Sequence, residues 1–523
     1  MFPGQRKVFQ HTNLRRNRTT KIINFYILIV IILVIGLFLT ALNFHELHNI
    51  RQEHHFNIKQ RMSSLTFEAA KPIVWIREKP NTKSNGPEGY LKHIYHMFEK
   101  LGFQFGGQWS EWVVLWSHDY PFSSSQQDVL QNLSPFQKVN HFPGSGHITS
   151  KVNLAQTDLD FIPKAFEMPI RKRQFLEFAS RYTNFSWIQK HSQHRGIEVK
   201  PFEKLELYKA NIFIQEYISN PFLIDGRKFD IGIYTVLTSI DPLRVYFIDG
   251  EALFRFCPEV YYPFNSSNLD KYVIRNLYKP LWEMPSLSDL YVNHGYTFKN
   301  SFDQHLVNVG KDPNLIWEKI KSAIRDVILM KEPEIIKAVE KYNSKRNFFE
   351  LVRFDFILDE NLRIYMMEAN MSPNLSSDHF PGNARLYEHV LFNLLGLVGI
   401  EYYTSEQNHL AHENTMYVTS QDTQVFPEYC QAEMCNANCQ PLVCKLCKHC
   451  ITGELQIDIK SAYLEHLHRG TARRIFPPSI LPVDALSWKP DFPLPLGDKL
   501  NLKNRLMYIW FLGKCRLDPG WCH

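Results

Sequence analysis

The 523-residue chain has little excess charge of either sign and a modest share of charged residues. Charged residues make up 21% of it and hydrophobic residues 44%, which is typical of a globular rather than a disordered protein. The formal net charge of +6 is mild, so composition gives no argument for nucleic-acid binding, although a basic face for an acidic partner is compatible with it. The length allows two or three domains with ample core.

Cysteine is nearly absent from the first 429 residues, where Cys257 stands alone. The other eight are Cys430, Cys435, Cys439, Cys444, Cys447, Cys450, Cys515 and Cys522. Three of them form a C-x₂-C-x₂-C run that could bind zinc, which would imply a reducing compartment. Eight cysteines also make an even set for four disulfides, which would imply an oxidising one. Because two separate C-x₂-C pairs are missing, we favour disulfides, with their connectivity open.

One long apolar run lies near the start of the chain. Residues Ile22–Leu42 contain no charge over a length that can cross a bilayer as a helix. A signal peptide would have a shorter apolar region and a small-residue cleavage site, so an uncleaved anchor is favoured. The basic tail at 1–21 places the N-terminus in the cytoplasm, which predicts a type II, single-pass protein with a stalk at 43–70.

The rest of the chain is predicted to hold a body at 71–405 and a Cys-rich extension at 406–523. Short β-rich runs alternate with amphipathic segments, which predicts an α+β body with a mainly antiparallel sheet. The clearest strands are expected at 73–76, 112–116, 212–218 and 231–237. Helices are expected at 90–101 and 313–342, and another is compatible with 455–467.

The most informative stretch is a predicted hairpin within residues 348–374. Two apolar runs flank Asp359-Glu360-Asn361, and a loop of two or four residues would put Asp355 opposite Met366. Glu368 and Asn370 would then share its face, which would make an oxygen cluster suited to Mg²⁺ and to phosphates. A three-residue loop would break this register. The simpler alternative is one salt-bridged aspartate and one exposed glutamate.

Other segments carry weaker signals of the same kind. Lys190 ends an apolar strand and could reach phosphates, although such a lysine is more often solvated. Gly196 follows a polar loop where the backbone could approach a phosphate. The apolar strand ending at Ile218 could offer backbone groups to an adenine edge, or could be plain core.

Together these blocks resemble the tubulin–tyrosine ligase-like family over about residues 71 to 400. The matching blocks, in the family's order, are NHFPGS with Ile148-Thr149-Ser150-Lys151, WIQK with RGI, QEYI, NPFLIDGRKFD, TSIDPLRVY and FDFILDENLRIYMMEANMSP. The resemblance implies an ATP-grasp fold and a ligase that forms an amide through an acyl phosphate. It further implies ATP and Mg²⁺ as cofactors, tubulin with its acidic tails as partner, and glutamate as the most expected amino acid.

The resemblance also implies roles for individual residues. The nucleotide would be bound by Lys190, Arg195, Gly196, Ile197, Gln215, Glu216, Tyr217, Ile218, Lys228, Asp230 and Asn276. Arg255 matches a substrate-binding arginine and is the catalytic candidate. Mg²⁺ would be held by Asp355, Glu368 and Asn370.

One position departs from the family pattern. Asp230 is followed by Ile231 and Gly232, where the family has leucine and arginine, so a guanidinium expected beside the reacting groups is missing. Arg353 could substitute for it. Losing one such donor typically lowers the rate on the order of 10²–10³-fold. Two alternatives to a tubulin ligase therefore stay open: a protein that binds nucleotide without turnover, and a lumenal ligase with another substrate.

Overall fold

The computed structural model describes residues 71–78, 86–123, 127–183, 185–191, 196–400 and 418–523, together with Gly36. The predicted basic tail, transmembrane segment and stalk lie outside the described residues, Gly36 apart. Among the helices in the described part of the chain, none is long and apolar enough to span a bilayer. Residues 71–523 form one compact unit.

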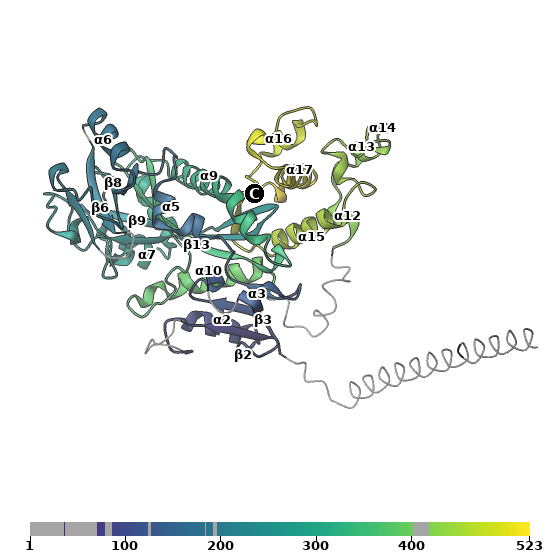
Figure 1. Cartoon of the computed structure of the whole chain (residues 1–523), viewed down its shortest axis with the longest axis horizontal. Coiled ribbons are helices and arrows are strands. Elements are labelled where there is room, and N and C mark those ends of the chain that lie inside the picture. Colours follow the sequence, from purple (N-terminus) through teal and green to yellow (C-terminus); the bar gives the residue numbers. More distant parts are fainter. Residues whose placement is uncertain are drawn as a thin grey trace, which may run out of the picture. The chain divides into compact units, whose positions relative to one another are not determined.

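The first part of this unit is a small parallel sheet. Its strands, in spatial order, are β2 (Gln104–Gly106), β1 (Ile73–Arg77), β3 (Trp112–Ser117) and β4 (Lys138–Val139). Helix α2 (Lys92–Lys100) buries Ile94, Met97 and Phe98 and lies against α10 (Ala384–Leu397; Figure 1). The strands and helix predicted here from the apolar pattern are confirmed.

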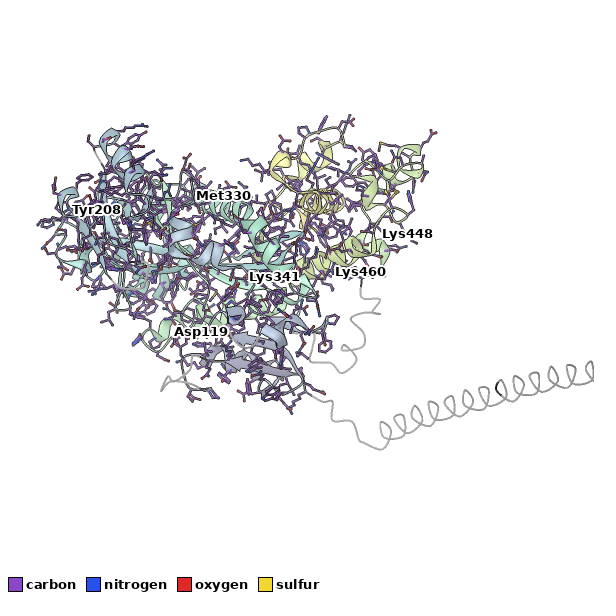
Figure 2. The ribbon with its side chains drawn as sticks, in the orientation of Figure 1. Asp119, Tyr208, Met330, Lys341, Lys448 and Lys460 are labelled. Carbon is purple, nitrogen blue, oxygen red and sulfur yellow. A yellow bond between two sulfur atoms is a disulfide. The ribbon has the colours of Figure 1, made fainter. Side chains whose placement is uncertain are left out.

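A second, antiparallel sheet carries the segments predicted to bind nucleotide. Its strands, in spatial order, are β5 (Ala165–Met168), β8 (Ile212–Tyr217), β6 (Ser186–His191) and β7 (Ile197–Lys200). Helix α6 (Lys172–Arg181) covers it through a buried aromatic cluster that includes Phe175 and Trp187, whose ring centroids are 4.9 Å apart. Tyr208 lies on the outer surface of this lobe (Figure 2), and the Lys172 Nζ is 3.6 Å from its ring centroid.

The third sheet has seven strands and is organised around β9. Its strands are β9 (Phe229–Ile240), β10 (Leu243–Ile248), β11 (Leu253–Phe256), β12 (Lys279–Pro280), β13 (Glu350–Leu358), β14 (Ile364–Asn370) and β15 (Ala472–Phe476). Strand β9 pairs with β13 along one edge, and with β11 and then β10 along the other, all antiparallel. The predicted mainly antiparallel body is confirmed, and the fold is a mixture of α and β elements. Asp230, Arg255 and Asp355 thereby come onto three adjacent strands.

The other helices lie around the three sheets and in the Cys-rich extension. The remaining α-helices are α3 (Gln127–Gln131), α4 (Gly146–Thr149), α5 (Lys151–Ala155), α7 (Pro285–Val292), α8 (Phe298–Asn308), α9 (Pro313–Val339), α12 (Ser420–Thr423), α13 (Pro427–Cys430), α14 (Glu433–Asn436), α15 (Gly453–Leu467), α16 (Pro482–Ser487) and α17 (Leu502–Leu517). The predicted helix at 313–342 is α9, which starts where the Asp312 side chain accepts a hydrogen bond from the Asn314 N–H. Its periodic residues, Ile316, Ile320 and Ile324 among them, are all buried.

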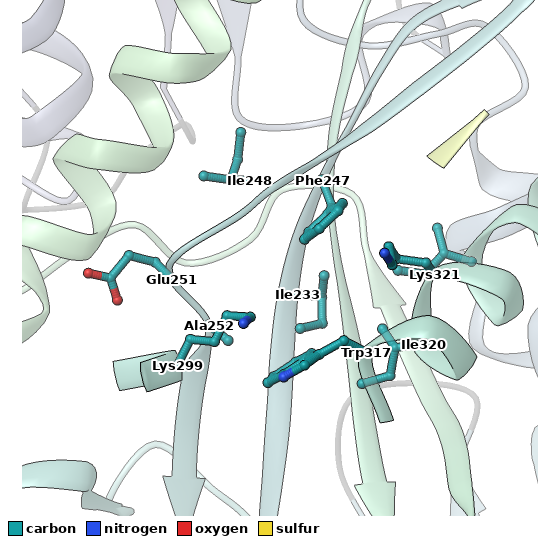
Figure 3. Close-up of a pocket in the computed structure, with 10 residues that line it drawn as sticks. Ile233, Phe247, Ile248, Glu251, Ala252, Lys299, Trp317, Ile320 and Lys321 are labelled. Atoms are coloured by element: carbon teal, nitrogen blue, oxygen red, sulfur yellow. The ribbon is translucent and has the colours of Figure 1, made fainter. Parts of the chain in front are cut away.

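A cavity of about 10 Å³ lies between this helix and the sheet (Figure 3). Its walls are mainly apolar side chains such as Ile233, Phe247 and Trp317. Such a volume holds one water molecule at most. We therefore interpret it as a gap in core packing and place the candidate site elsewhere.

All eight C-terminal cysteines are paired. The disulfides are Cys430–Cys447, Cys435–Cys444, Cys439–Cys450 and Cys515–Cys522. The preference for disulfides over zinc is confirmed. Among the described histidine, cysteine and acidic side chains, Cys439, His449 and Cys450 form the one group of three whose ligand atoms lie within 4.8 Å of one another, and two of these form a disulfide with each other.

The Cys-rich extension completes the central sheet. Strand β15 pairs antiparallel with β10, the neighbour of β9. On α15, which carries Lys460 in Figure 2, the buried Glu465 accepts two hydrogen bonds from the Arg244 guanidinium, at 2.8 and 2.9 Å. Its Oε2 also accepts one from Thr238 at 2.9 Å. The extension is thus joined to the body through a sheet edge and a buried ion pair.

A second buried polar contact joins α9 to the start of α17. The Glu332 carboxylate accepts hydrogen bonds from the Asn501 and Asn504 side-chain amides at 2.9 and 2.7 Å. The Asn504 Oδ1 in turn accepts from the Leu243 N–H at 2.7 Å, at the start of β10. Burial raises the pKa of Glu332 from 4.5 to about 7, because the two neutral amides only partly replace water around the charge.

We expect Glu332→Gln to stabilise the protein at alkaline pH and to have little effect at acid pH. A raised folded-state pKa means that the contribution of Glu332 is most favourable below about pH 4.5 and is lost as pH rises through about 7. The free energy of unfolding of the variant should therefore exceed that of the wild type by an amount that grows between pH 5 and pH 8, to roughly 2 kcal/mol. Thermal unfolding of both proteins at the two pH values checks this, and an equal difference at both would contradict it.

Candidate functional site

The loop of the β13–β14 hairpin has three residues, so the predicted loop length is wrong. The Asp359 N–H donates to the Arg363 carbonyl at 3.0 Å, which leaves residues 360–362 as the loop. Leu362 has φ +59°, the left-handed conformation that closes many three-residue hairpins. The Asp359 carboxylate accepts from the N–H groups of Asn361 and Arg363, both at 2.9 Å, and this stabilises the turn.

A β-bulge restores the shared face that this loop would otherwise have removed. Phe356 lies opposite Met366, but the next pair is Asp355 with Glu368, so Met367 is the extra residue. The predicted pairing of Asp355 with Met366 is therefore wrong. The prediction that Asp355, Glu368 and Asn370 share one face is confirmed. A three-residue loop alone would have turned Glu368 and Asn370 to the opposite face, and the one-residue register shift at the bulge turns them back.

Two guanidinium groups hold the carboxylates of this face. Arg255 donates to Asp230 from Nε and Nη2 at 2.9 and 2.6 Å, and its Nη2 also lies 2.8 Å from Asp355 Oδ2. Arg353 donates to both Asp355 oxygens at 2.7 and 2.9 Å. The Asn370 amide adds a bond to Asp355 Oδ2 at 3.0 Å. The two aspartates are thus joined by Arg255 into one buried network.

Gly232 leaves the space that Arg353 occupies. It pairs with Asp355 across β9 and β13. A Cβ at position 232 would lie 2.8 Å from the Arg353 Cδ, which is closer than such atoms come without one of them moving. The guanidinium beside Asp355 therefore comes from Arg353 on β13, the residue that the sequence offered as a possible substitute for the missing arginine.

The pKa values of the two aspartates differ because their partners differ. Burial acts to raise the pKa of Asp355, but Arg353 and Arg255 outweigh it and lower that pKa to about 2. For Asp230, burial dominates and raises the pKa to about 6, with Arg255 opposing it. Asp355 is therefore the permanent anion of this face.

Two lysines, Lys228 buried and Lys190 half-buried, supply positive charge, and among the described residues neither forms an ion pair with a carboxylate. The Lys190 Nζ donates to the Gln215 Oε1 at 2.6 Å, and the Lys228 Nζ lies 4.7 Å from the ring centroid of Tyr217. Burial lowers the pKa of each lysine to about 8. The charge of Glu368 opposes this shift at Lys190, which shows that the two sheets bring these groups near each other. Such lysines favour an anionic ligand that would restore their countercharge.

The segment predicted to hold adenine is the end of β8. Gln215 is buried, and its amide donates to the Pro163 carbonyl at 3.2 Å. The Glu216 N–H donates to the Lys164 carbonyl at 2.8 Å, and the Tyr217 hydroxyl lies 2.9 Å from that of Tyr261. Ile218 is the first residue beyond the strand. The contacts fix the backbone at this end of the sheet, and the adenine role stays a prediction.

The other predicted nucleotide residues are less closely assembled. Arg195 lies outside the described residues. Gly196 has φ +86°, and a Cβ there would lie 2.5 Å from the His191 ring, so this position requires glycine. Ile197 is the first residue of β7. Asn276 is exposed, and within the described part of the chain it forms no hydrogen bond with another predicted site residue.

Lys151 belongs to this site although the sequence analysis gave it no role. Its Nζ lies 3.4 Å from the Glu368 Oε2. It is the first residue of α5, whose preceding residue Ser150 accepts a hydrogen bond from the Asn153 N–H. A serine cap followed by lysine is common at helix starts, so the local signal for a site residue was weak.

The proposed metal ligands fit Mg²⁺ in donor type. Carboxylate and amide oxygens are the ligands that this hard cation prefers, and Glu368 is about a third exposed, with a relative accessibility of 31%. Asp355 differs from the other two, because both of its oxygens already accept hydrogen bonds from Arg353. Arg353 is thus the cation with which a metal would compete for Asp355.

Comparisons with known proteins identify the family to which this sequence is similar. Residues 129–409 match the tubulin-tyrosine ligase family. The chain is 38% identical over 453 residues to the probable tubulin polyglutamylase ttll-15 of Caenorhabditis elegans, covering 83% of this chain and 84% of that protein. This chain belongs to the tubulin-tyrosine ligase family.

Relatives of lower identity match about half of this chain. The chain is 30% identical over 309 residues to the tubulin monoglutamylase TTLL4 of Homo sapiens, and 29% identical over 313 residues to the tubulin polyglutamylase TTLL6 of Mus musculus. These matches cover 55% and 54% of this chain, but only 25% and 36% of the relatives. The family resemblance inferred from the sequence blocks is confirmed.

We expect Gly232→Ala to destabilise the protein through Arg353. The added Cβ would displace a side chain that holds both Asp355 oxygens, at a cost of about 1–3 kcal/mol. In an Arg353→Met background the same change should cost much less. A four-protein cycle of urea unfolding free energies measures this coupling.

The matched control for this cycle is Gly146→Ala. Its Cβ would meet nothing within 4 Å, so no cost should appear in either background. An equal loss from Gly232→Ala with and without Arg353 would show that the glycine serves something other than the arginine.

Proposed function

We propose that this chain is an ATP-dependent ligase that adds glutamate to glutamate side chains of tubulin. Membership of the family supports the reaction class, and relatives named tubulin polyglutamylase or monoglutamylase support the amino acid and the substrate. The observation that carries the proposal is the gathering of Asp355, Glu368 and Asn370 on one face, with Lys190 and Lys228 nearby. This combination suits a nucleotide with its metal ion.

The reaction would have two steps. A substrate carboxylate attacks the γ-phosphorus of ATP, so that an acyl phosphate forms and ADP leaves. The amine of the incoming amino acid then attacks the acyl carbon, so that an amide forms, phosphate leaves and the amine loses a proton. Because the acyl phosphate is sensitive to water, closure of one lobe over the other would protect it.

The residues of the site have distinct parts in this scheme. Lys190 and Lys228 would bind the phosphates, whose negative charge would compensate for the hydration that burial removes from the two ammonium groups. Arg255 would orient the reacting carboxylate. Its Nε and Nη2 are fixed by Asp230 and Asp355, and within the described residues its Nη1 has no hydrogen-bond partner.

Mg²⁺ would be held by Glu368 and Asn370 together with Asp355. When bound, it would supply positive charge that neutralises the phosphate oxygens. The Arg353 guanidinium would supply part of the same charge from the protein itself.

A second candidate function is nucleotide binding without turnover. It is favoured by the Arg353–Asp355 pair, which occupies a proposed metal ligand, and by the glycine at position 232. This candidate predicts saturable nucleotide binding and no ligation.

We expect Glu368→Gln to lower glutamate incorporation into tubulin on the order of 10²–10³-fold, because it removes one charged oxygen ligand from the nucleotide site. The measurement is ATP-dependent incorporation of labelled glutamate by the full-length protein. The matched control is Glu360→Gln, at the exposed tip of the same hairpin, which should keep wild-type activity.

The outcomes separate the two candidates. If the wild-type protein incorporates no glutamate under conditions where an active relative works, the ligase proposal is wrong. Nucleotide binding that persists in that case would favour the second candidate. Multiple ATP turnovers that depend on Glu368 would exclude it.

A variant of the ligase proposal concerns the compartment. Four disulfides favour an oxidising lumen, and the charges that flank the predicted membrane segment favour the same side. Tubulin is cytosolic, so a lumenal body would act on another substrate with acidic side chains.

Protease protection in sealed vesicles tests the compartment. A lumenal body is expected to resist added protease until detergent opens the vesicles, and its eight C-terminal cysteines should resist thiol labelling without reductant. Digestion of the body in intact vesicles would place it in the cytosol and restore tubulin as the substrate.

A further inference from the structure

A pocket lies where the Cys-rich extension meets the ligase body, away from the nucleotide-site residues. Its volume is about 110 Å³. Its walls come from β4, β9, β10, the 3-10 turn at 345–347, the end of α10, and α15 of the extension. A cavity of this size has room for several water molecules or for one compact ion.

Three cationic side chains line this pocket: Lys138, Arg244 and Arg346. Two acids oppose them, since Glu465 pairs with Arg244 at 2.8 Å and Asp458 pairs with Arg346 at 2.8 Å. Lys138 has no carboxylate partner among the described residues, and its Nζ donates to the Arg346 carbonyl at 2.7 Å. These five side chains therefore carry one more positive charge than negative charges.

Arg244 also has an unused donor. It is 4% exposed, and its Nη1 is buried without a hydrogen-bond partner within the described part of the chain, although Nε and Nη2 are satisfied by Glu465. A buried guanidinium N–H without an acceptor is costly unless a ligand or water completes it. The side chains of Thr238, Ser239 and Ser461 add hydroxyl groups to the same wall.

We propose that this pocket binds a compact oxyanion of the phosphate type. Such an ion offers several acceptor oxygens at once, and so can accept from both the Arg244 Nη1 and the Lys138 ammonium. Its charge offsets the excess cation, which an uncharged ligand or water would leave in place. Burial, together with the charges of Arg244 and Arg346, also lowers the pKa of Lys138 to about 8, and the charge of Glu465 opposes this shift.

The consequence is a link between the extension and the body that depends on an anion. The pocket exists only because α15 packs against β10 and the segment at 345–347. An ion bound there contacts both parts, and should therefore stabilise their docking.

Thermal unfolding of the full-length protein tests this proposal. Inorganic phosphate is titrated at constant ionic strength with chloride as the replacement salt. We expect a saturable rise in Tm of about 1–3 °C at ten times Kd. Lys138→Met, which keeps the length of the side chain but not its charge, should abolish that rise.

Two control variants make the result specific. Lys345→Met removes ion pairs to Asp241 and Glu454 at the same junction without lining the pocket, so it should lower the initial Tm and keep the phosphate response. Lys228→Met should also keep it, which distinguishes this pocket from the nucleotide site. A phosphate response that survives Lys138→Met, or that chloride reproduces, would overturn the proposal.

Discussion

The β-bulge between Phe356 and Asp355 is the constraint on which the candidate site depends. A hairpin with a three-residue loop would turn Glu368 and Asn370 away from Asp355. The single extra residue, Met367, returns them to its face. Because β13 also pairs with β9, the same face carries Asp230 on β9 and Arg255 on the strand beyond it. One local irregularity thus sets the position of most of the charged groups.

Within the described part of the chain, the negative charges on this face have ion-pair partners and two of the positive charges of the site do not. The aspartates are neutralised within the protein by Arg255 and Arg353, whereas the half-buried Lys190 and the buried Lys228 form no ion pair with a carboxylate among the described residues. An anion gains more from this arrangement than a cation does, because buried ammonium groups lose hydration that only a countercharge can replace. The geometry accordingly supports nucleotide binding most directly, and the reaction beside it depends on how readily Arg353 releases Asp355.

The Cys-rich extension is structurally part of the ligase body. It supplies an edge strand to the central sheet, and the Arg244–Glu465 pair is buried at the junction. Breaking such a pair leaves an uncompensated charge, so the extension cannot be removed at low cost. The disulfides act within the extension, where five of their cysteines are buried in an apolar cluster with residues such as Trp510 and Phe511.

The sequence by itself determined the family and the main strands and helices, because hydrophobic periodicity and ordered motif blocks are local properties. It predicted the shared face of Asp355, Glu368 and Asn370 from a loop length that is wrong, and the face is kept only by the bulge. It also indicated the disulfides, since eight cysteines in one region form an even set. Only the tertiary structure decided that Asp355 faces Glu368 across a bulge, that Arg353 occupies the space above Gly232, and that Glu465 meets Arg244. These contacts join residues on different strands or from distant segments, and their geometry depends on loop length, twist and packing that no local pattern encodes.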